Sequence, residues 1–418
     1  MDSRTRVRLA LNHQQPDRPP VDLGSTAVTG AHVSIVSKLR QRLGLSRPGE
    51  PVKVVEPYQM LGEVANDLMD ALGADFIGLS MRRNLFAFEN RDWKPWVAFD
   101  GTPVLVPEKF NTVPEPNGDI LLYPEGDQSV PASGRMPKGG FYFDSIIRQP
   151  PIDERALKVD DNLEEFTPVS QEDLEHLRST SDALYRDTSY AIVGSFGGTS
   201  FGDIALVPAP FLKNPKGIRD VTEWYVSTVT RREHVREIFH RQCEIALKNL
   251  TLIHEAVGEK VAVVFVSGTD FGTQNAPFIS PDAYRDLYQP FHRRVNDWIH
   301  HHTRWKTFCH SCGSIEALIP DLIDGGFDIL NPVQCSAANM EPERLKRKYG
   351  DKVCFWGGLV DTQKTLPFGS PAEVAEEVAA RLKILSHGGG YVANPIHNIQ
   401  PGCPAENVLE AFRVVREG

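Results

Sequence analysis

A histidine and a cysteine two residues apart are the residues whose types and spacing most clearly suggest chemistry. His310 and Cys312 end the run Trp305-Lys-Thr-Phe-Cys-His-Ser-Cys, which is typical of a buried strand that turns into a helix. Side chains two positions apart in extended chain point to the same side, so both could reach one ion. Neutral imidazole and thiolate are ligands that Zn²⁺ favours. A pair cannot close such a site, and the best candidate for a third ligand is Cys403.

Packing in the core is the alternative interpretation of this pair, because free cysteine is among the most buried residue types. The chain has six cysteines, and five of them follow residue 300. In the absence of an export signal, we interpret them as thiols or ligands rather than as a disulfide framework. Cys309 should alternate away from His310 and pack in the core. Cys335 and Cys354 receive no role.

Composition and charge exclude several classes of function. The chain has 418 residues, a charged fraction of 24% and a net charge of −10, which argues against nucleic acid as the main partner. No apolar run approaches the roughly 20 residues that cross a bilayer. The N-terminal residues carry charges but no apolar signal segment. We therefore expect a cytoplasmic protein without a membrane or nucleic-acid partner.

Eight strand-like segments, each followed by a helical pattern, would position these residues. They lie near residues 21, 74, 190, 261, 305, 327, 353 and 390. The alternation predicts an α/β fold, a (β/α)₈ TIM barrel that spans residues 1–418 as a single domain. Residues 80–165, after the second strand, are rich in Pro and Gly and contain short alternating runs, which predict a large β-containing insertion that acts as a lid. A surface hairpin without a role is the alternative.

Polar residues follow the barrel strands at the end where active sites of such barrels lie. Asp270 and Gln274 follow the fourth strand, and we expect them to orient the substrate or to supply a displaceable fourth ligand. An ordinary loop-capping role is the alternative for Asp270. Four further residues follow the sixth and eighth strands and are predicted to bind substrate: Asn331, Gln334, Asn394 and His397. The strands that precede Cys312 and Cys403 are three steps apart around the ring, so their loops can converge.

Two sulfurs and one imidazole would leave a tetrahedral zinc ion with one open position, which is typical of a catalytic site. Such an ion can hold a thiol as its thiolate at neutral pH. It can also polarise an ether or hydroxyl oxygen and make it a better leaving group. Both uses suit the transfer of a methyl group.

Four segments of the chain resemble the uroporphyrinogen decarboxylase superfamily, and more narrowly its cobalamin-dependent methyltransferase branch. They are Leu11-Asn-His-Gln-Gln-Pro-Asp-Arg-Pro-Pro-Val21, Asp270-Phe-Gly-Thr-Gln274 with Ser280-Pro281, His310-Ser-Cys312-Gly313, and Gly402-Cys403-Pro404 with Glu406-Asn407. The resemblance implies that His310, Cys312 and Cys403 bind zinc. It also implies a barrel that docks on a separate corrinoid protein and exchanges a methyl group with the cobalt of that protein's cobalamin.

The direction of transfer stays open at this point. The methyl group could pass from a small donor, such as an aryl methyl ether, to cobalt, or from cobalt to a thiol acceptor. Aromatic residues in the predicted insertion favour the donor direction, an O-demethylation, although such residues could instead form the contact of a homodimer. The alternatives are a metal-free porphyrinogen decarboxylase and a non-catalytic zinc-binding barrel. The segment Val21-Asp-Leu-Gly24 lacks both the arginine-rich signature of the decarboxylase and the His-x-His of barrel hydrolases.

Overall fold

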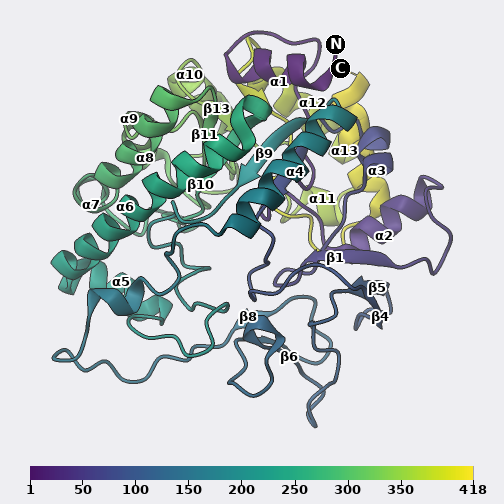
Figure 1. Ribbon diagram of the computed structural model, residues 1–418. Coiled ribbons are helices and arrows are strands. Elements are labelled where there is room, and N and C mark those ends of the chain that lie inside the picture. The colour runs from purple at the N-terminus through teal and green to yellow at the C-terminus, as the bar shows by residue number, and fades with distance from the viewer. Residues whose placement is uncertain (418) are drawn as a thin grey trace.

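A parallel sheet of seven strands forms the centre of the computed structural model, which describes residues 1–417 (Figure 1). Its strand order is β14-β13-β12-β11-β10-β9-β3, and every neighbouring pair is parallel. The strands are β3 (Phe76–Ser80), β9 (Ala191–Ser195), β10 (Val261–Ser267), β11 (Lys306–His310), β12 (Ile329–Asn331), β13 (Cys354–Trp356) and β14 (Tyr391–Val392). All seven lie where the sequence pattern predicted strands. The chain is therefore mixed α/β, with the strand order and direction of a TIM-like barrel.

The segment around Val21 joins the two edges of this sheet. Val21 forms a parallel bridge with Ala393, which directly follows β14. On one side the Asp22 N–H donates to the Ala393 carbonyl at 3.0 Å, and on the other the Asp75 N–H donates to the Val21 carbonyl at 2.7 Å. The predicted first strand is thus a single bridged residue, and it lies between β14 and β3.

Helices follow most of the strands. In chain order they are α1 (Ser3–Leu11), α2 (Val33–Arg42), α3 (Asn66–Leu72), α4 (Gln171–Asp187), α5 (Val221–Thr230), α6 (Arg232–Val257), α7 (Pro281–Leu287), α8 (Gln289–His302), α9 (Ile319–Asp324), α10 (Pro342–Tyr349), α11 (Thr365–Phe368), α12 (Pro371–Leu385) and α13 (Ala405–Glu417). Short 3₁₀ turns are η1 (Pro124–Gly126), η2 (Val159–Asn162), η3 (Gly258–Lys260) and η4 (Glu316–Leu318). Within residues 1–417, no helix combines the length and apolarity that a membrane span requires.

Two helices differ from their predicted bounds. Ser280-Pro281-Asp282 is typical of a helix start and predicts one helix to about His302. The helix starts as expected, with Ser280 as its cap, but it is divided at Tyr288 into α7 and α8. The sequence pattern also predicts a helix over 57–73 that ends near Gly73, and of this range only α3 is helical. It ends as predicted at Gly73, whose φ of 73° is the left-handed conformation that favours glycine at a helix end.

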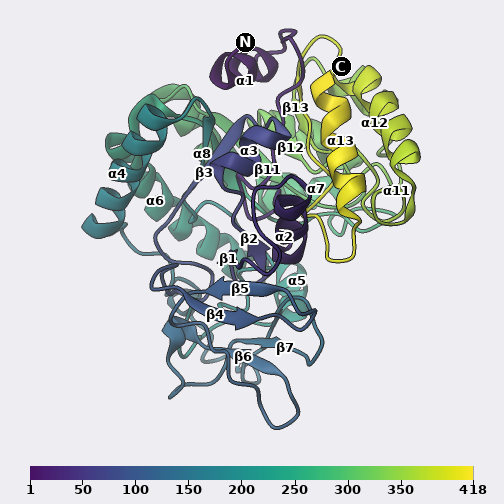
Figure 2. The same cartoon turned by 90° about the vertical axis from the view of Figure 1, so that its right-hand side faces the viewer.

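Two small sheets lie on the side of the barrel opposite the chain termini (Figures 1 and 2). One has the order β2-β1-β5-β4 and the other β6-β7-β8. Their strands are β1 (Val52–Glu56), β2 (Leu61–Gly62), β4 (Lys94–Val97), β5 (Pro103–Val106), β6 (Ile120–Leu122), β7 (Gly134–Met136) and β8 (Asp144–Ser145). The sequence pattern did not reveal β1 and β2. Because β1 precedes the barrel strand β3 and pairs with β5, the first sheet combines residues from both sides of β3.

A buried carboxylate holds the N-terminal segment against the barrel. Asp75 is fully buried just before β3, and its two oxygens each accept from one arginine at 2.7 Å, Arg6 and Arg18. The Val21 N–H also donates to Asp75, at 2.8 Å. Arg18, in the Pro-Asp-Arg-Pro-Pro motif, therefore has a structural role: it fixes the carboxylate that positions the first strand.

Replacing Asp75 with Ala should lower the free energy of unfolding by about 3–5 kcal/mol, because two largely buried guanidinium groups lose their shared partner. Asp67→Ala is the matched control, since Asp67 pairs with Arg40 at 2.7 Å but is 46% exposed. That change should cost about 1 kcal/mol or less. Urea denaturation of both variants measures the difference. Equal losses would contradict a structural role for the buried cluster.

Candidate metal centre

His310, Cys312 and His397 form a compact group at the end of the barrel strands. One ligand atom from each residue lies within 4.8 Å of the others. The Nε2 atom of His310 is 3.4 Å from the Cys312 thiol, and the rings of His310 and His397 have centroids 5.3 Å apart. His310 is the last residue of β11, so the strand fixes its position, and His397 lies in the loop after β14. The structure thus brings together two of the three predicted ligands with His397, which was predicted to bind substrate.

The donor atoms of this group fit a zinc ion. Zinc bonds of about 2.3 Å to sulfur and about 2.0 Å to nitrogen place the two donors about 3.5 Å apart in a tetrahedron. The 3.4 Å between Cys312 and His310 is close to that spacing. Burial, and then the neighbouring His310, lower the pKa of His397 to about 3, which keeps this ring in the neutral form that binds metals. Three nitrogen and sulfur donors would leave a fourth position open.

Two of the predicted polar residues, Asp270 and Gln334, hold the loop that carries Cys312, and a third, Gln274, bonds to Gln334. The Asp270 carboxylate accepts from the Cys312 N–H at 2.6 Å, and its nearer oxygen is 3.9 Å from His310 Nε2. The Gln334 side-chain oxygen accepts from the Gly313 N–H at 2.8 Å. Gln334 in turn donates to the side-chain oxygen of Gln274 at 3.2 Å. The roles predicted for Asp270, Gln274 and Gln334 toward substrate stay predictions, while Asp270 and Gln334 both contact the loop that carries Cys312.

Gly313, which completes the His-x-Cys-Gly motif, is required by a close backbone approach. Its φ is 88°, and a Cβ atom there would lie 2.5 Å from the backbone of Gly272. Only glycine satisfies both conditions. The motif therefore combines two metal-ligand types with the residue that lets the β11 loop pack against the loop after β10.

Asn331 and Asn394, both predicted to bind substrate, are buried. Asn331 is 1% exposed, and its side-chain oxygen lies 2.6 Å from His310 Nδ1. Asn394 is 0% exposed and donates to the Asp22 carbonyl at 2.9 Å. Its own side-chain oxygen has no hydrogen-bond partner among the described residues. Neither side chain lies at the surface of the barrel mouth.

Cys403 is not part of the compact group. It is buried, and its N–H donates to the Gln400 carbonyl at 3.4 Å in the turn before α13. His397 precedes it by six positions in the same loop. Sequence spacing could not identify His397 as a ligand candidate, because its approach to His310 depends on how this loop crosses the barrel end. The sequence feature that could have pointed to His397 as a ligand is its place after the last strand, close to Cys403.

Asp22 is a buried acid at the same end of the barrel. Its carboxylate accepts from the Trp356 indole N–H at 3.1 Å and from the Ser25 N–H at 3.2 Å. Burial raises the pKa of Asp22 to about 6, and the hydrogen bonds offset only part of this effect. The folded protein therefore holds this proton more tightly than the unfolded chain does. The resulting stability is fully present below about pH 4 and is lost as the pH rises through 6.

Asp22→Asn should remove this pH dependence. Between pH 4 and pH 7.5 the wild type should lose about 3 kcal/mol of unfolding free energy relative to the variant, the value that corresponds to the rise in pKa. Urea denaturation at several pH values measures the difference. Parallel pH profiles for the two proteins would contradict the prediction.

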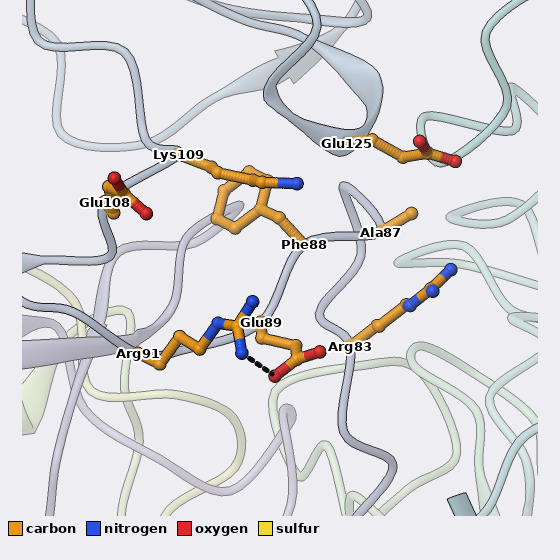
Figure 3. Close-up of a pocket in the computed structure, with 8 residues that line it drawn as sticks. All are labelled: Arg83, Ala87, Phe88, Glu89, Arg91, Glu108, Lys109 and Glu125. Carbon is orange, nitrogen blue, oxygen red and sulfur yellow. Dashed lines mark ion pairs between the residues drawn. The ribbon is translucent and has the colours of Figure 1, made fainter. Parts of the chain in front are cut away.

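A separate cavity of about 180 Å³ lies in the region of the two small sheets (Figure 3). It shares no residue with the group of His310, Cys312 and His397. The residues that line it are Arg83, Ala87, Phe88, Glu89, Arg91, Glu108, Lys109 and Glu125. Figure 3 shows Arg91 paired with Glu89, at 3.5 Å. The cavity is lined by three basic and three acidic side chains, whose charges balance, and we assign the cavity no function.

Similarity to known proteins agrees with this fold. A methyltransferase from Methanosarcina mazei superposes with a TM-score of 0.56 and 15% sequence identity, over 100% of this chain and 99% of that one. At this identity the likeness shows the shared fold. No curated protein matches the chain in sequence.

Residues 216–418 match the family model described as uroporphyrinogen decarboxylase (URO-D). The matched part runs from just before α5 to the C-terminus and contains His310, Cys312, His397 and Cys403. This match agrees with the superfamily resemblance noted in the sequence motifs and limits it to residues 216–418, about half of the chain.

Proposed function

We propose that this protein is a zinc-dependent methyltransferase that moves a methyl group between a small substrate and the cobalt of a separate corrinoid protein. The observation that carries the proposal is the group of His310, Cys312 and His397 at the barrel end, within the residues that match the URO-D family model. The fold shared with the Methanosarcina mazei methyltransferase supports it. A metal-free decarboxylase would leave this group of ligand-type residues without a use.

The residues around the group have distinct tasks in this proposal. Zinc bound there would hold a thiol as thiolate or polarise an ether oxygen. His310 and Cys312 would bind it, and we propose Cys403 as the third protein ligand, with His397 from the same loop as the alternative to Cys403, so that one position stays open in either case. Asp270 fixes the Cys312 backbone and places a carboxylate close to His310. The open side of the group is where the substrate would be oriented.

We favour an aryl methyl ether as the methyl donor. The aromatic residues of the segment 80–165 were expected to shape a pocket, but Phe110 and Phe143 are buried and pack against each other at 5.7 Å. They form the core of that segment. The better support is the stacked pair of Tyr225 and Phe278, with ring centroids 5.4 Å apart. The Tyr225 hydroxyl donates to the Asp270 carbonyl at 3.3 Å. Because the Asp270 carboxylate lies 3.9 Å from His310, this aromatic pair is close to the group of His310, Cys312 and His397.

We also propose that residues 80–165 form a lid-like subdomain at the mouth of the barrel. Two contacts tie this segment to loops beside the strands. The His32 ring nitrogen lies 2.9 Å from the Phe141 carbonyl. Lys213, in the loop after β9, pairs with Asp127 at 2.9 Å. Such contacts from two sides suit a segment that shields the mouth from water.

A cobalamin assay tests the proposed activity in both directions. Zinc-loaded protein is mixed with reduced cobalamin and aryl methyl ethers, or with methylcobalamin and thiols, and the visible spectrum of the cobalamin is followed. We expect methyl transfer that depends on zinc. Transfer in neither direction, or transfer equally fast with metal-stripped protein, would contradict the proposal. Turnover of a porphyrinogen by the metal-stripped protein would favour decarboxylation instead.

A further inference from the structure

Asn331 connects His310 to the backbone of the neighbouring strand. His310 and Asn331 are paired residues on the parallel strands β11 and β12. The His310 Nδ1 atom lies 2.6 Å from the side-chain oxygen of Asn331. The Asn331 side-chain nitrogen donates to the Trp356 carbonyl, on the next strand, at 2.9 Å. Three adjacent strands therefore fix this arrangement.

The orientation of the Asn331 amide follows from its second partner. The Trp356 carbonyl can only accept a hydrogen bond, so the amide must turn its NH₂ group toward it. The amide oxygen then faces His310, and it too can only accept. His310 Nδ1 must therefore carry the hydrogen, which leaves the lone pair on Nε2. Nε2 is the atom that lies 3.4 Å from the Cys312 thiol.

We propose that Asn331 is a positioning residue: it selects the tautomer and the ring orientation of His310 and thereby sets the affinity of the metal centre. The inference rests on the proposed zinc site and replaces the substrate-binding role predicted for Asn331. Asn331 is 1% exposed and His310 is 3% exposed, so water cannot take over the bond. Hydrogen bonds to the second ring nitrogen typically contribute about 10–100-fold to metal affinity.

Asn331→Leu should therefore weaken zinc binding by about 10–100-fold, measured by competition with a chelator. Asn331→Asp restores an acceptor for Nδ1 and should recover most of this loss. Asn296→Leu is the matched control. Asn296 is also fully buried and donates to a backbone carbonyl, that of Gly325, at 2.8 Å, but it lies on α8 outside the group. Its replacement should leave zinc affinity unchanged.

A second readout separates this inference from the zinc site itself. ¹⁵N NMR of histidine-labelled, metal-free protein should show His310 with hydrogen on Nδ1 in the wild type and a mixture of tautomers in Asn331→Leu. Unchanged zinc affinity in Asn331→Leu, or an equal loss in Asn296→Leu, would overturn the positioning role. A wild type that binds no zinc would instead refute the proposed function, and the tautomer would still test the role of Asn331.

Discussion

Replacing Cys312 with Ala is expected to remove zinc from this protein and abolish methyl transfer, while the barrel stays folded. Cys312 supplies the sulfur that lies 3.4 Å from His310 Nε2, and its N–H is held by Asp270. Total zinc-binding free energies of about 10–16 kcal/mol, shared among four ligands, imply a loss of about 10²–10³-fold for one thiolate. Chelator competition and the cobalamin assay measure the two losses, and thermal unfolding reports on the fold.

Cys243→Ala provides the control for this substitution. Cys243 is a fully buried thiol on α6, and it does not belong to the metal group. Its truncation should lower stability through the lost packing while zinc content and activity stay at wild-type levels. A Cys312→Ala protein that retains full zinc and full activity would show that this thiol is not a ligand.

Cys403→Ala is expected to have the second largest effect, a fall in zinc affinity of about 10²–10³-fold together with loss of methyl transfer. The resemblance to the cobalamin-dependent methyltransferases implies this thiol as a ligand, whereas the compact group contains His397 in its place. We expect His397→Ala to weaken binding less, because a neutral imidazole brings no negative charge to the ion.

Replacing zinc with cobalt allows Cys403→Ala and His397→Ala to be compared by their absorption spectra, without an activity assay. Thiolate-to-cobalt absorption should fall in Cys403→Ala and persist in His397→Ala, since only the first change removes a sulfur. The reverse order of affinities, with Cys403→Ala unchanged and His397→Ala strongly weakened, would replace Cys403 with His397 in the ligand set. His310, Cys312 and His397 would then be the protein ligands.

The barrel strands could be predicted because their sequences carry a strong local signal. Val261-Ala-Val-Val-Phe-Val266 is almost continuously apolar, as expected of a parallel strand buried on both faces, and it forms β10. The strands of one parallel sheet end at the same edge, so the prediction that Asp270, His310 and Gln334 meet there followed from topology. Their hydrogen bonds around the 312–313 loop agree with it.

Other features depend on contacts between distant parts of the chain, which no local pattern records. β1 is only five residues long and becomes a strand by pairing with β5, far along the chain. His397 reaches His310 through the path of a loop without regular structure. Phe110 and Phe143 are aromatic residues of the kind that line binding pockets. In the structure they are buried against each other in the core of the segment 80–165. Asn331 faces His310 because their strands are neighbours in register.

The zinc content of the purified protein, measured beside that of His310→Ala, tests the central claim most directly. His310 is the best-defined ligand candidate, since a strand end and Asn331 fix its ring. A catalytic zinc centre predicts about one zinc per chain in the wild type and almost none in the variant. A wild type that contains no zinc and takes up none when zinc is added would contradict the metal centre, and with it the proposed methyltransferase.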